Sequence, residues 1–355
     1  PFAPLWSIAL PYITGNIVSK SATEAAGGRI GTDPVAESGP YLRASWSPKE
    51  KTVLTRNPDW KGEAPAWDNI EILPIDDENT AEIAFEAGEL DFTRVSLGSV
   101  ERYRAGVPNG GTLVENPSLF YVWLGMNLDH PKLQNPKLRQ AIQHAIDVPS
   151  ILQAAYFGAV VPSTGIIAPG LAGHREAGKV APAADFAKAA DLLAESGETN
   201  VTLTLDVLNK TTFTTTAQII QATLASIGIT VEINVLESGA FWDSGNNENL
   251  QLVLNRFSMT PDPTYATAWF TTEQAGIWNW ENFRNAEFDK LHADAARETD
   301  LEKRAEMYIR AQDLMEESGA YRFITHEATT VVHSSGIAPA LRPDGLTLLR
   351  YFGKS

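Results

Sequence analysis

Residues 201–235 read VTLTLDVLNKTTFTTTAQIIQATLASIGITVEINV, and this stretch decides the fold. Its two ends, residues 201–205 and 230–235, have the β-rich alternating pattern that predicts strands. In the middle, residues 212–227 carry apolar side chains at steps of three and four, which is typical of a helix lying on a sheet. A strand, a helix and a second strand in this order predict a β-α-β crossover, the building unit of an α/β fold.

The flanking sequence extends the α/β pattern in both directions. Short β patterns separated by turns predict sheet, and polar-capped apolar repeats predict helices. Strands are expected at 41–46, 53–56, 70–73, 90–94, 120–126, 321–324 and 329–332, and helices at 80–87, 136–146, 184–196 and 301–317. The chain is therefore expected to pass from a first lobe into a second and to return near its end. Two such crossings would make a hinge.

Composition restricts the class of protein. At 355 residues the chain exceeds the usual size of one core, so two α/β lobes with a cleft between them are expected. The formal net charge of -16 makes nucleic acid an unexpected partner, and we interpret the acidic excess as a solubility feature. The chain has no cysteine, which rules out disulfides and thiolate chemistry.

Sequence motifs for catalysis are missing. The six histidines show no HExxH spacing, and neither a GxSxG elbow nor a GxxxxGK[ST] loop occurs. No metal, cofactor or catalytic residue is therefore predicted. The carboxylates are numerous enough that an acid and base pair of a glycan-acting enzyme stays open as an alternative.

Two aromatic clusters could contact an organic ligand. One is Tyr121-Val122-Trp123 at the predicted first crossing, and the other is Trp278-Asn279-Trp280 in a loop rich in Gly and Asn. Both core packing and ligand contact stay open for each cluster.

Several motifs resemble, in order, those of a known family. Residues 37–41 read ESGPY, residues 54–60 read LTRNPDW, and Asn127 precedes PKLRQAIQHAID at residues 136–147. With residues 192–197, 225–233 and 288–289, these segments resemble the bacterial extracellular solute-binding proteins that serve dipeptide, oligopeptide, nickel, opine and oligosaccharide importers.

The resemblance implies an α/β fold of the two-lobe periplasmic-binding-protein type, type II, in the large peptide-binding class. Lobe I is expected at residues 1–119 and 326–355, and lobe II at residues 120–325. Family members carry a substantial portion before the position of Pro1. Lobe I is therefore expected to be incomplete and to expose a sheet edge.

The resemblance also implies a function. The chain is expected to be the periplasmic or otherwise extracytoplasmic substrate-binding component of an ABC importer, and a monomer. It would enclose a peptide-like, opine-like or oligosaccharide-like solute by hinge closure and deliver it to a membrane permease without breaking a bond. The alternatives are a glycan-acting enzyme or a ligand sensor on the same fold.

The predicted ligand contacts follow from matching positions. In the family's peptide binders, an aromatic residue is followed three positions later by an Asp that pairs with the peptide's α-ammonium group. Here these positions hold Phe257 and Thr260. A hydroxyl cannot neutralise a buried ammonium, which puts the anchoring of a free amino terminus in question. Asp262 could substitute for the missing acid or could cap the following helix. The predicted contacts are Phe120, Trp123, Ser238, Phe241, Trp242, Phe257, Ser258, Thr260, Asp262 and His326.

Overall fold

The computed structural model describes residues 18–28, 36–75, 77–245, 247, 249–343 and 345–355. The expectation about the start of the chain at Pro1 lies outside them. Backbone contacts divide the chain into two compact units. Of the described residues, unit 1 includes those in 117–328, and unit 2 includes those in 18–116 and 329–355. The predicted lobe boundaries lie within three residues of these divisions, and the identification of the units with ligand-binding lobes stays a prediction.

Unit 1 is built on a mixed sheet with the strand order β10-β5-β9-β7-β8. Strands β7 and β8 pair in parallel from Thr202↔Thr230 to Leu208↔Leu236, and α8 connects them, so the predicted β-α-β crossover is confirmed. Strand β9 joins the parallel part through β7 and pairs antiparallel with β5. The short β6 pairs with β10. The bounds are β5 Thr112–Met126, β6 Val161–Pro162, β7 Thr202–Leu208, α8 Thr211–Ala225, β8 Thr230–Leu236, β9 Leu252–Ser258 and β10 Tyr321–His333.

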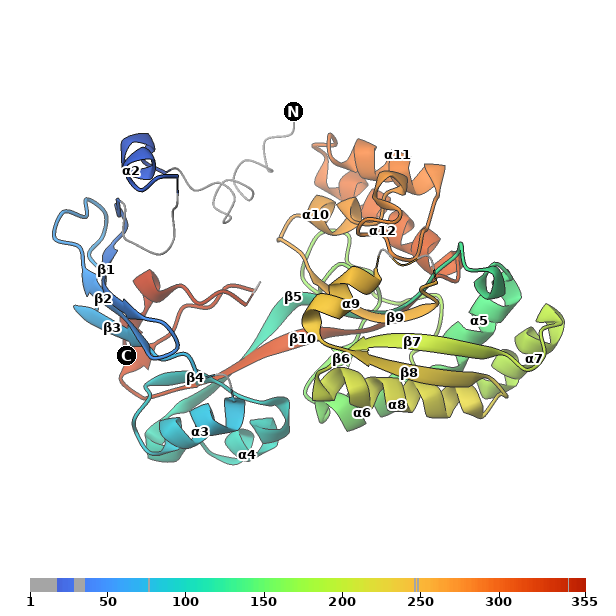
Figure 1. The fold of residues 1–355 in the computed structure, drawn as a ribbon, viewed down its shortest axis with the longest axis horizontal. Helices are drawn as coiled ribbons and strands as arrows, with labels where there is room; N and C mark the ends of the chain where they lie inside the picture. Colours follow the sequence, from blue (N-terminus) through green and yellow to red (C-terminus); the bar gives the residue numbers. More distant parts are fainter. Residues whose placement is uncertain (1–17, 29–35, 76, 246, 248, 344) are drawn as a thin grey trace. The chain divides into compact units, whose positions relative to one another are not determined.

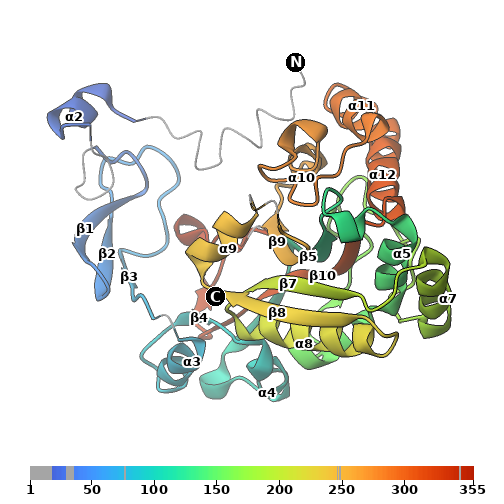
Figure 2. The same ribbon diagram turned by 45° about the vertical axis from the view of Figure 1, so that its right-hand side comes forward.

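Helices cover both faces of this sheet. Helices α6 and α8 lie on one side of it, and α10, α11 and α12 lie on the other (Figures 1 and 2). Most of these helices begin at an Asn or Asp side chain that accepts a backbone N–H of the first turn. Such caps are Asn135, Asp147, Asp185, Asp262, Asn285 and Asp300. The bounds are α5 Pro136–Ala145, α6 Val148–Tyr156, α7 Phe186–Ser196, α9 Ser238–Ser244, α10 Pro263–Ala268, α11 Ala286–Ala295 and α12 Leu301–Glu317.

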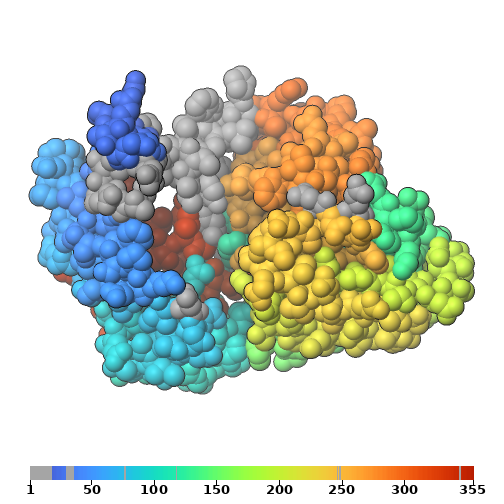
Figure 3. Space-filling view, in the orientation of Figure 1, coloured from blue at the N-terminus to red at the C-terminus, as the bar shows by residue number. Residues whose placement is uncertain are grey.

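The main core of unit 1 lies between the sheet and helices α10 to α12. It is strongly aromatic and includes Tyr121, Trp123, Phe270, Phe288 and Tyr321, each almost fully buried. Burial of one such side chain is worth about 2 kcal/mol or more. The segments of this unit pack side by side although they are far apart in the sequence, as the green, yellow and orange surface shows (Figure 3). The first aromatic cluster is therefore core.

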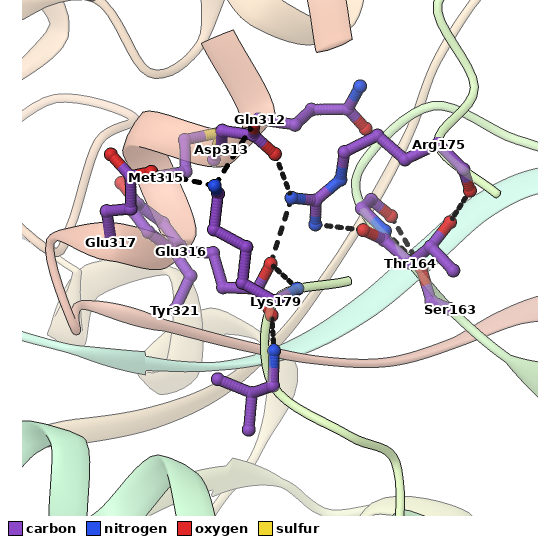
Figure 4. Close-up of polar contacts among 12 residues, drawn as sticks. Ser163, Thr164, Arg175, Lys179, Gln312, Asp313, Met315, Glu316, Glu317 and Tyr321 are labelled. Atoms are coloured by element: carbon purple, nitrogen blue, oxygen red, sulfur yellow. Dashed lines mark hydrogen bonds and ion pairs between the residues drawn. The ribbon is translucent and has the colours of Figure 1, made fainter. Parts of the chain in front are cut away.

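A buried ion-pair network fixes the loop after β6 to α12 (Figure 4). The Arg175 guanidinium lies 2.8 Å from Asp313 and 2.9 Å from Glu316, both on α12. Glu316 also accepts the backbone N–H groups of Lys179 and Val180. Removing one partner of a buried pair typically costs about 3–5 kcal/mol, so this loop is firmly held.

Unit 2 contains a separate antiparallel sheet in the order β1-β2-β3. Its strand β4 pairs with the end of β10, from Val331↔Arg94 to His333↔Phe92. Helix α3 begins at Asp77, whose side chain accepts the Thr80 N–H, and this confirms the predicted start near residue 80. The bounds are α2 Lys20–Ala25, β1 Tyr41–Ser47, β2 Lys51–Arg56, β3 Asn69–Ile72, α3 Glu78–Glu86, β4 Phe92–Arg94, α4 Val100–Ala105, β11 Ile337–Ala338 and β12 Gly353–Lys354.

Two strands differ most from the prediction in length. The strand expected at 120–126 begins at Thr112, and the two strands expected at 321–324 and 329–332 form one strand, β10. The linking residues 325–328 lack apolar alternation, but Thr325 and His326 pair with β6 and so continue the strand. Within the described ranges, no helix has the length and apolar content needed to cross a membrane.

Candidate functional site

Four aromatic side chains form a continuous surface on unit 1, which we call the aromatic wall. It consists of Trp242 on α9, Phe257 on β9, Trp269 at the end of α10 and Trp278 in the segment that follows. Trp242 and Trp278 are each 41% exposed, Trp269 is half-buried and Phe257 is buried. The wall therefore has two partly exposed indole rings packed on a buried phenyl ring.

The rings of the wall contact one another. Trp242 stacks on Phe257 with 6.4 Å between ring centroids and 9° between planes. Trp278 meets Trp242, Phe257 and Trp269 edge to face at 6.5, 6.3 and 5.4 Å. These separations leave no space for a group between the rings, so a ligand would pack on the wall and not inside it.

Trp123 supports the wall from behind. It is fully buried on β5, and its ring centroid lies 5.0 Å from that of Phe257. Its indole Nε1–H donates to Glu281 Oε1 at 2.7 Å. Trp123 is therefore a support of the wall and has no exposed surface of its own.

Segment 277–283 positions Trp278. The Asn279 side chain is fully buried and donates to the carbonyls of Phe270, Thr271 and Phe283. Trp280 is also buried and packs against Gly245, where a Cβ atom would overlap its ring. In the second aromatic cluster, Asn279 and Trp280 are thus core, and Trp278 is exposed.

Glu281 is an acidic residue of this segment that is buried without a cationic partner among the described residues. Its side chain is 1% exposed, and Oε2 has no hydrogen-bond partner. Burial raises the pKa of Glu281 to about 7, and the hydrogen bonds from the side chains of Trp123 and Tyr321 offset only part of that rise.

Asp262 is also buried, but its carboxylate has a charged partner. It caps α10 by accepting the Thr264 N–H at 2.9 Å, so the capping interpretation is confirmed. The Arg304 guanidinium donates to both of its oxygens at 2.8 and 2.9 Å. Burial acts to raise the pKa of Asp262, but the hydrogen bonds from Arg304 and Thr264 outweigh it and hold the pKa below its usual value. Asp262 is 3% exposed, and its charge is already neutralised.

Thr260 lies between Phe257 and Asp262 in the chain. It is 6% exposed, and its hydroxyl donates to the Asp262 carbonyl at 3.2 Å. The position predicted to match the acid of the family's peptide binders therefore has no charge here.

Phe120 and Ser258 lie on the other face of the sheet. They pair directly across β5 and β9, as do Tyr121 and Phe257 one position along. Because neighbouring residues of a strand point to opposite faces, Phe120 and Ser258 face away from the wall. The Arg256 guanidinium lies 3.6 Å from the centre of the Phe120 ring and is paired with Glu327.

The remaining predicted residues have varied surroundings. Ser238 is the exposed first residue of α9, and Phe241 is buried against Trp280 with ring centroids 5.5 Å apart. His326 is 6% exposed, and neither ring nitrogen makes a hydrogen bond, although backbone groups of Gly165 and Phe120 lie near. Burial lowers the pKa of His326 to about 4, so its imidazole is neutral at pH 7.

Sequence reasoning missed Trp269 and Glu281 as parts of this site, and it left the role of Trp278 open. Trp269 follows the α10 cap by seven residues and had no distinguishing pattern. The signal for Glu281 is an acid embedded in the aromatic run WNWENF at residues 278–283. In the described part of the chain, no three His, Asp or Glu side chains are placed to hold a metal ion.

Comparison with known proteins identifies the family. Residues 1–278 match the family described as bacterial extracellular solute-binding proteins, family 5 Middle. The chain is 25% identical over 349 residues to the glutathione-binding protein GsiB of Escherichia coli K12, which covers 95% of this chain and 67% of that protein.

Solved structures agree with this match. The periplasmic binding protein DppA of Helicobacter pylori, solved with the peptide STSA, superposes with a TM-score of 0.82 at 25% identity, over 100% of this chain and 70% of that one. The putative peptide binding protein AppA of Clostridium difficile gives a TM-score of 0.85 at 22% identity, over 95% and 72%. These likenesses confirm the predicted α/β fold class.

The family consists of binding proteins that act outside the cytoplasm. This confirms the expectation of an extracytoplasmic transport receptor that is not an enzyme. The chain belongs to the bacterial extracellular solute-binding proteins of family 5 and is the substrate-binding component of an ABC transporter.

Proposed function

We propose that this chain binds a short peptide-like solute, with an apolar or aromatic group of the solute packed on the aromatic wall. The observation that carries the proposal is the exposure of Trp242 and Trp278 side by side on a buried aromatic support. Large exposed apolar surfaces of this kind mark ligand sites. GsiB binds glutathione and DppA was solved with a peptide, which supports the solute class.

The polar contacts that we propose are uncharged. Ser238 and Thr260 supply hydroxyl groups, and His326 supplies a neutral imidazole. Asp262 cannot pair with a ligand ammonium while Arg304 holds both of its oxygens. An unpaired buried ammonium would cost several kcal/mol, so the solute end beside Thr260 is expected to be neutral.

The other predicted residues have different proposed parts. Phe241 and Trp123 hold the wall from behind. Phe120 and Ser258 remain predicted contacts, but we do not expect them to contact the solute group that lies on Trp242, because they face the other side of the sheet.

Delivery completes the proposal. The solute is enclosed by hinge closure, and the loaded monomer docks on a membrane permease, with no bond broken. Nucleic acid stays an unexpected partner. Micromolar affinity corresponds to about 8 kcal/mol, which desolvation of an aromatic wall and a few hydrogen bonds can supply.

An oligosaccharide is the second candidate solute. The partial exposure of the Trp242 and Trp278 rings favours it, because aromatic rings also pack against the C–H face of a sugar ring. An opine-like solute would need a partner for its carboxylates. The wall offers none, so the opine-like alternative has the least support from unit 1.

Calorimetry on protein freed of bound solute by unfolding and refolding tests the proposal. The titrants are a library of di-, tri- and tetrapeptides, each with a free and an N-acetylated amino terminus, and a matched library of oligosaccharides. We expect binding of peptides that carry an aromatic side chain. Binding of sugars alone would favour the second candidate, and binding of neither library would overturn the proposal.

Substitution of the wall supplies the second test. Trp278→Ala removes an exposed face and is expected to weaken binding about ten- to hundredfold, as for a central aromatic contact. The matched control is Trp46→Ala, which removes a Trp of similar exposure, 44%, from β1 and outside the wall. Equal affinities of Trp278→Ala and the wild type would contradict the assignment of the wall.

A further inference from the structure

The Glu281 carboxylate is buried in unit 1 without a cation beside it. Its Oε1 accepts the Trp123 indole N–H at 2.7 Å, and Oε2 has no partner. In the described part of the chain, no lysine, arginine or histidine forms an ion pair with it. Two other buried acids of this unit, Asp262 and Glu316, are each paired with an arginine. Within the described ranges, Glu281 therefore differs from these two acids in having no cationic partner.

The chain makes room for this carboxylate. Gly125 lies two positions after Trp123 on β5, and a Cβ atom there would overlap Glu281 Oε1. The absent side chain lets the carboxylate approach the strand closely. Glu281 also accepts the Leu128 N–H through its backbone carbonyl, which fixes the backbone at this point.

The groups that face Glu281 are polar and uncharged. They are the phenol of Tyr121 on β5 and the phenol of Tyr321 on β10. The Tyr121 hydroxyl is buried and has no hydrogen-bond partner, and the same holds for the amide nitrogen of Asn255, the residue paired with Trp123 across β9. Burial raises the pKa of both tyrosines well above the usual value, so neither phenol ionises near neutral pH.

The two protonation states of Glu281 hold Trp123 differently. An ionised carboxylate accepts a charge-assisted hydrogen bond from the indole, roughly twice as strong as a neutral one. A protonated carboxyl accepts a weaker bond and gains an O–H donor that can serve an unpartnered acceptor such as the Tyr121 oxygen. Because burial brings the pKa of Glu281 to about 7, both states are populated near neutral pH.

Both sides of this hydrogen bond lead to the aromatic wall. Trp123 contacts Phe257, on which Trp242 stacks. Glu281 belongs to segment 277–283, which carries Trp278 three residues earlier. A change in how Trp123 and Glu281 hold each other therefore acts on the wall through two routes.

We propose that Glu281 is a proton-responsive positioning residue: gain or loss of its proton changes how Trp123 and segment 277–283 are held, and thereby changes the affinity of the aromatic wall for its solute. Glu281 itself has no exposed surface from which to contact the solute. The effect on affinity rests on the proposed function of the wall, whereas the effect on Trp123 does not.

A pH titration of the unliganded protein by NMR tests the first part. The indole N–H resonance of Trp123, assigned by its loss in Trp123→Phe, is expected to shift with a midpoint near pH 7. In Glu281→Gln, which keeps the acceptor oxygen and cannot ionise, the shift is expected to vanish. Selective labelling of the glutamate carboxyl carbons should also reveal one glutamate that titrates near pH 7 in the wild type. This measurement needs no variant, and its failure would overturn the proposal.

Solute affinity tests the second part. The probe is the capped peptide N-acetyl-Ala-Trp-Ala-amide, titrated at about pH 6 and pH 8. We expect its affinity in the wild type to change about fivefold or more, at the low end of typical coupling between sites. In Glu281→Gln it should not change. If the Trp123 resonance shifts with pH but the probe does not bind, the result counts against the proposed solute class alone. A probe that binds equally at both pH values would overturn the coupling.

Discussion

The region around Asp262 and the region around Glu281 each bury one carboxylate, and they treat its charge in opposite ways. Asp262 receives an arginine, a threonine hydroxyl and a helix N-terminus, and its pKa is held low. From the residues that the structure describes, Glu281 receives only uncharged donors, the Trp123 indole N–H and the Tyr321 phenol, and its pKa rises to about 7. Burial acts to raise the pKa of both acids, so it is the difference in their partners that sets their charge states apart.

The contrast also bears on function. Asp262 stays ionised over the physiological pH range and is paired within the protein. Its charge is therefore not available to a solute. The charge of Glu281 is variable and can make the site responsive.

The largest effect is expected when Arg304, the partner of Asp262, is replaced. Arg304→Met should leave Asp262 buried and unpaired and lower the free energy of unfolding by about 3–5 kcal/mol. Urea denaturation at pH 7 measures this. The double variant Asp262→Asn, Arg304→Met removes both charges and should recover part of the loss. A single variant as stable as the wild type would show that the ion pair carries no net stability.

Lowering the pH tests the contribution of the same Asp262–Arg304 ion pair to stability. The folded pKa of Asp262 lies below its usual value of 3.8, so the stabilisation is complete above that value and is lost as the pH falls through the folded pKa. The wild type should therefore lose this contribution in strongly acidic urea titrations. Arg304→Met should lack this loss.

Glu281→Gln is expected to have the next largest effect, with the opposite sign. A raised pKa means that the folded state holds its proton longer than the unfolded state, so the free energy of unfolding falls as the pH rises from about 4.5 to about 7. At pH 7 and above, this one group lowers the free energy of unfolding of the wild type by about 3 kcal/mol relative to its value below pH 4.5. Glu281→Gln should avoid it and be more stable than the wild type at pH 8, with little difference at pH 4.5. Parallel stability curves for the two proteins would contradict the raised pKa.

The sequence predicted one of these two regions better than the other. The place of Asp262 in Pro261-Asp262-Pro263 indicates a helix cap from local spacing alone, and the β-α-β crossover and the long helix α12 follow from periodicity in the same way. The arginine partner could not be predicted, because Arg304 lies 42 residues away in the chain.

Glu281 could not be predicted in this way. Its burial depends on a contact with Trp123, 158 residues earlier, and on the missing side chain at Gly125. Segment 277–283 is neither helix nor strand, so no period states which of its side chains point inward. For the same reason the sequence could not separate the exposed Trp278 from the buried Trp280.

Gly125→Ala tests the room made for Glu281. The added methyl group would overlap the carboxylate and should lower the free energy of unfolding by about 1–3 kcal/mol, as overpacking does. The matched control is Gly239→Ala in α9, where a Cβ atom meets open space and should stabilise the helix by about 0.5–1 kcal/mol. Equal thermal stability of the two variants would show that Glu281 does not need the space above Gly125.

Thr260→Asp has the smallest expected effect on stability and acts on solute choice. It places a second carboxylate next to the paired Asp262, and since Arg304 is already engaged, the new charge is free for a ligand ammonium. A charge-assisted hydrogen bond contributes about 1.5–3 kcal/mol, so peptides with a free amino terminus should bind about tenfold more tightly or better, and their N-acetylated forms should not. Calorimetry with matched pairs of peptides measures this ratio. Thr260→Asn, of the same shape and without charge, is the control. If Thr260→Asp leaves the ratio of the affinities for free and N-acetylated peptides unchanged, Thr260 does not lie beside the amino end of the solute. A different part of the solute then contacts the wall.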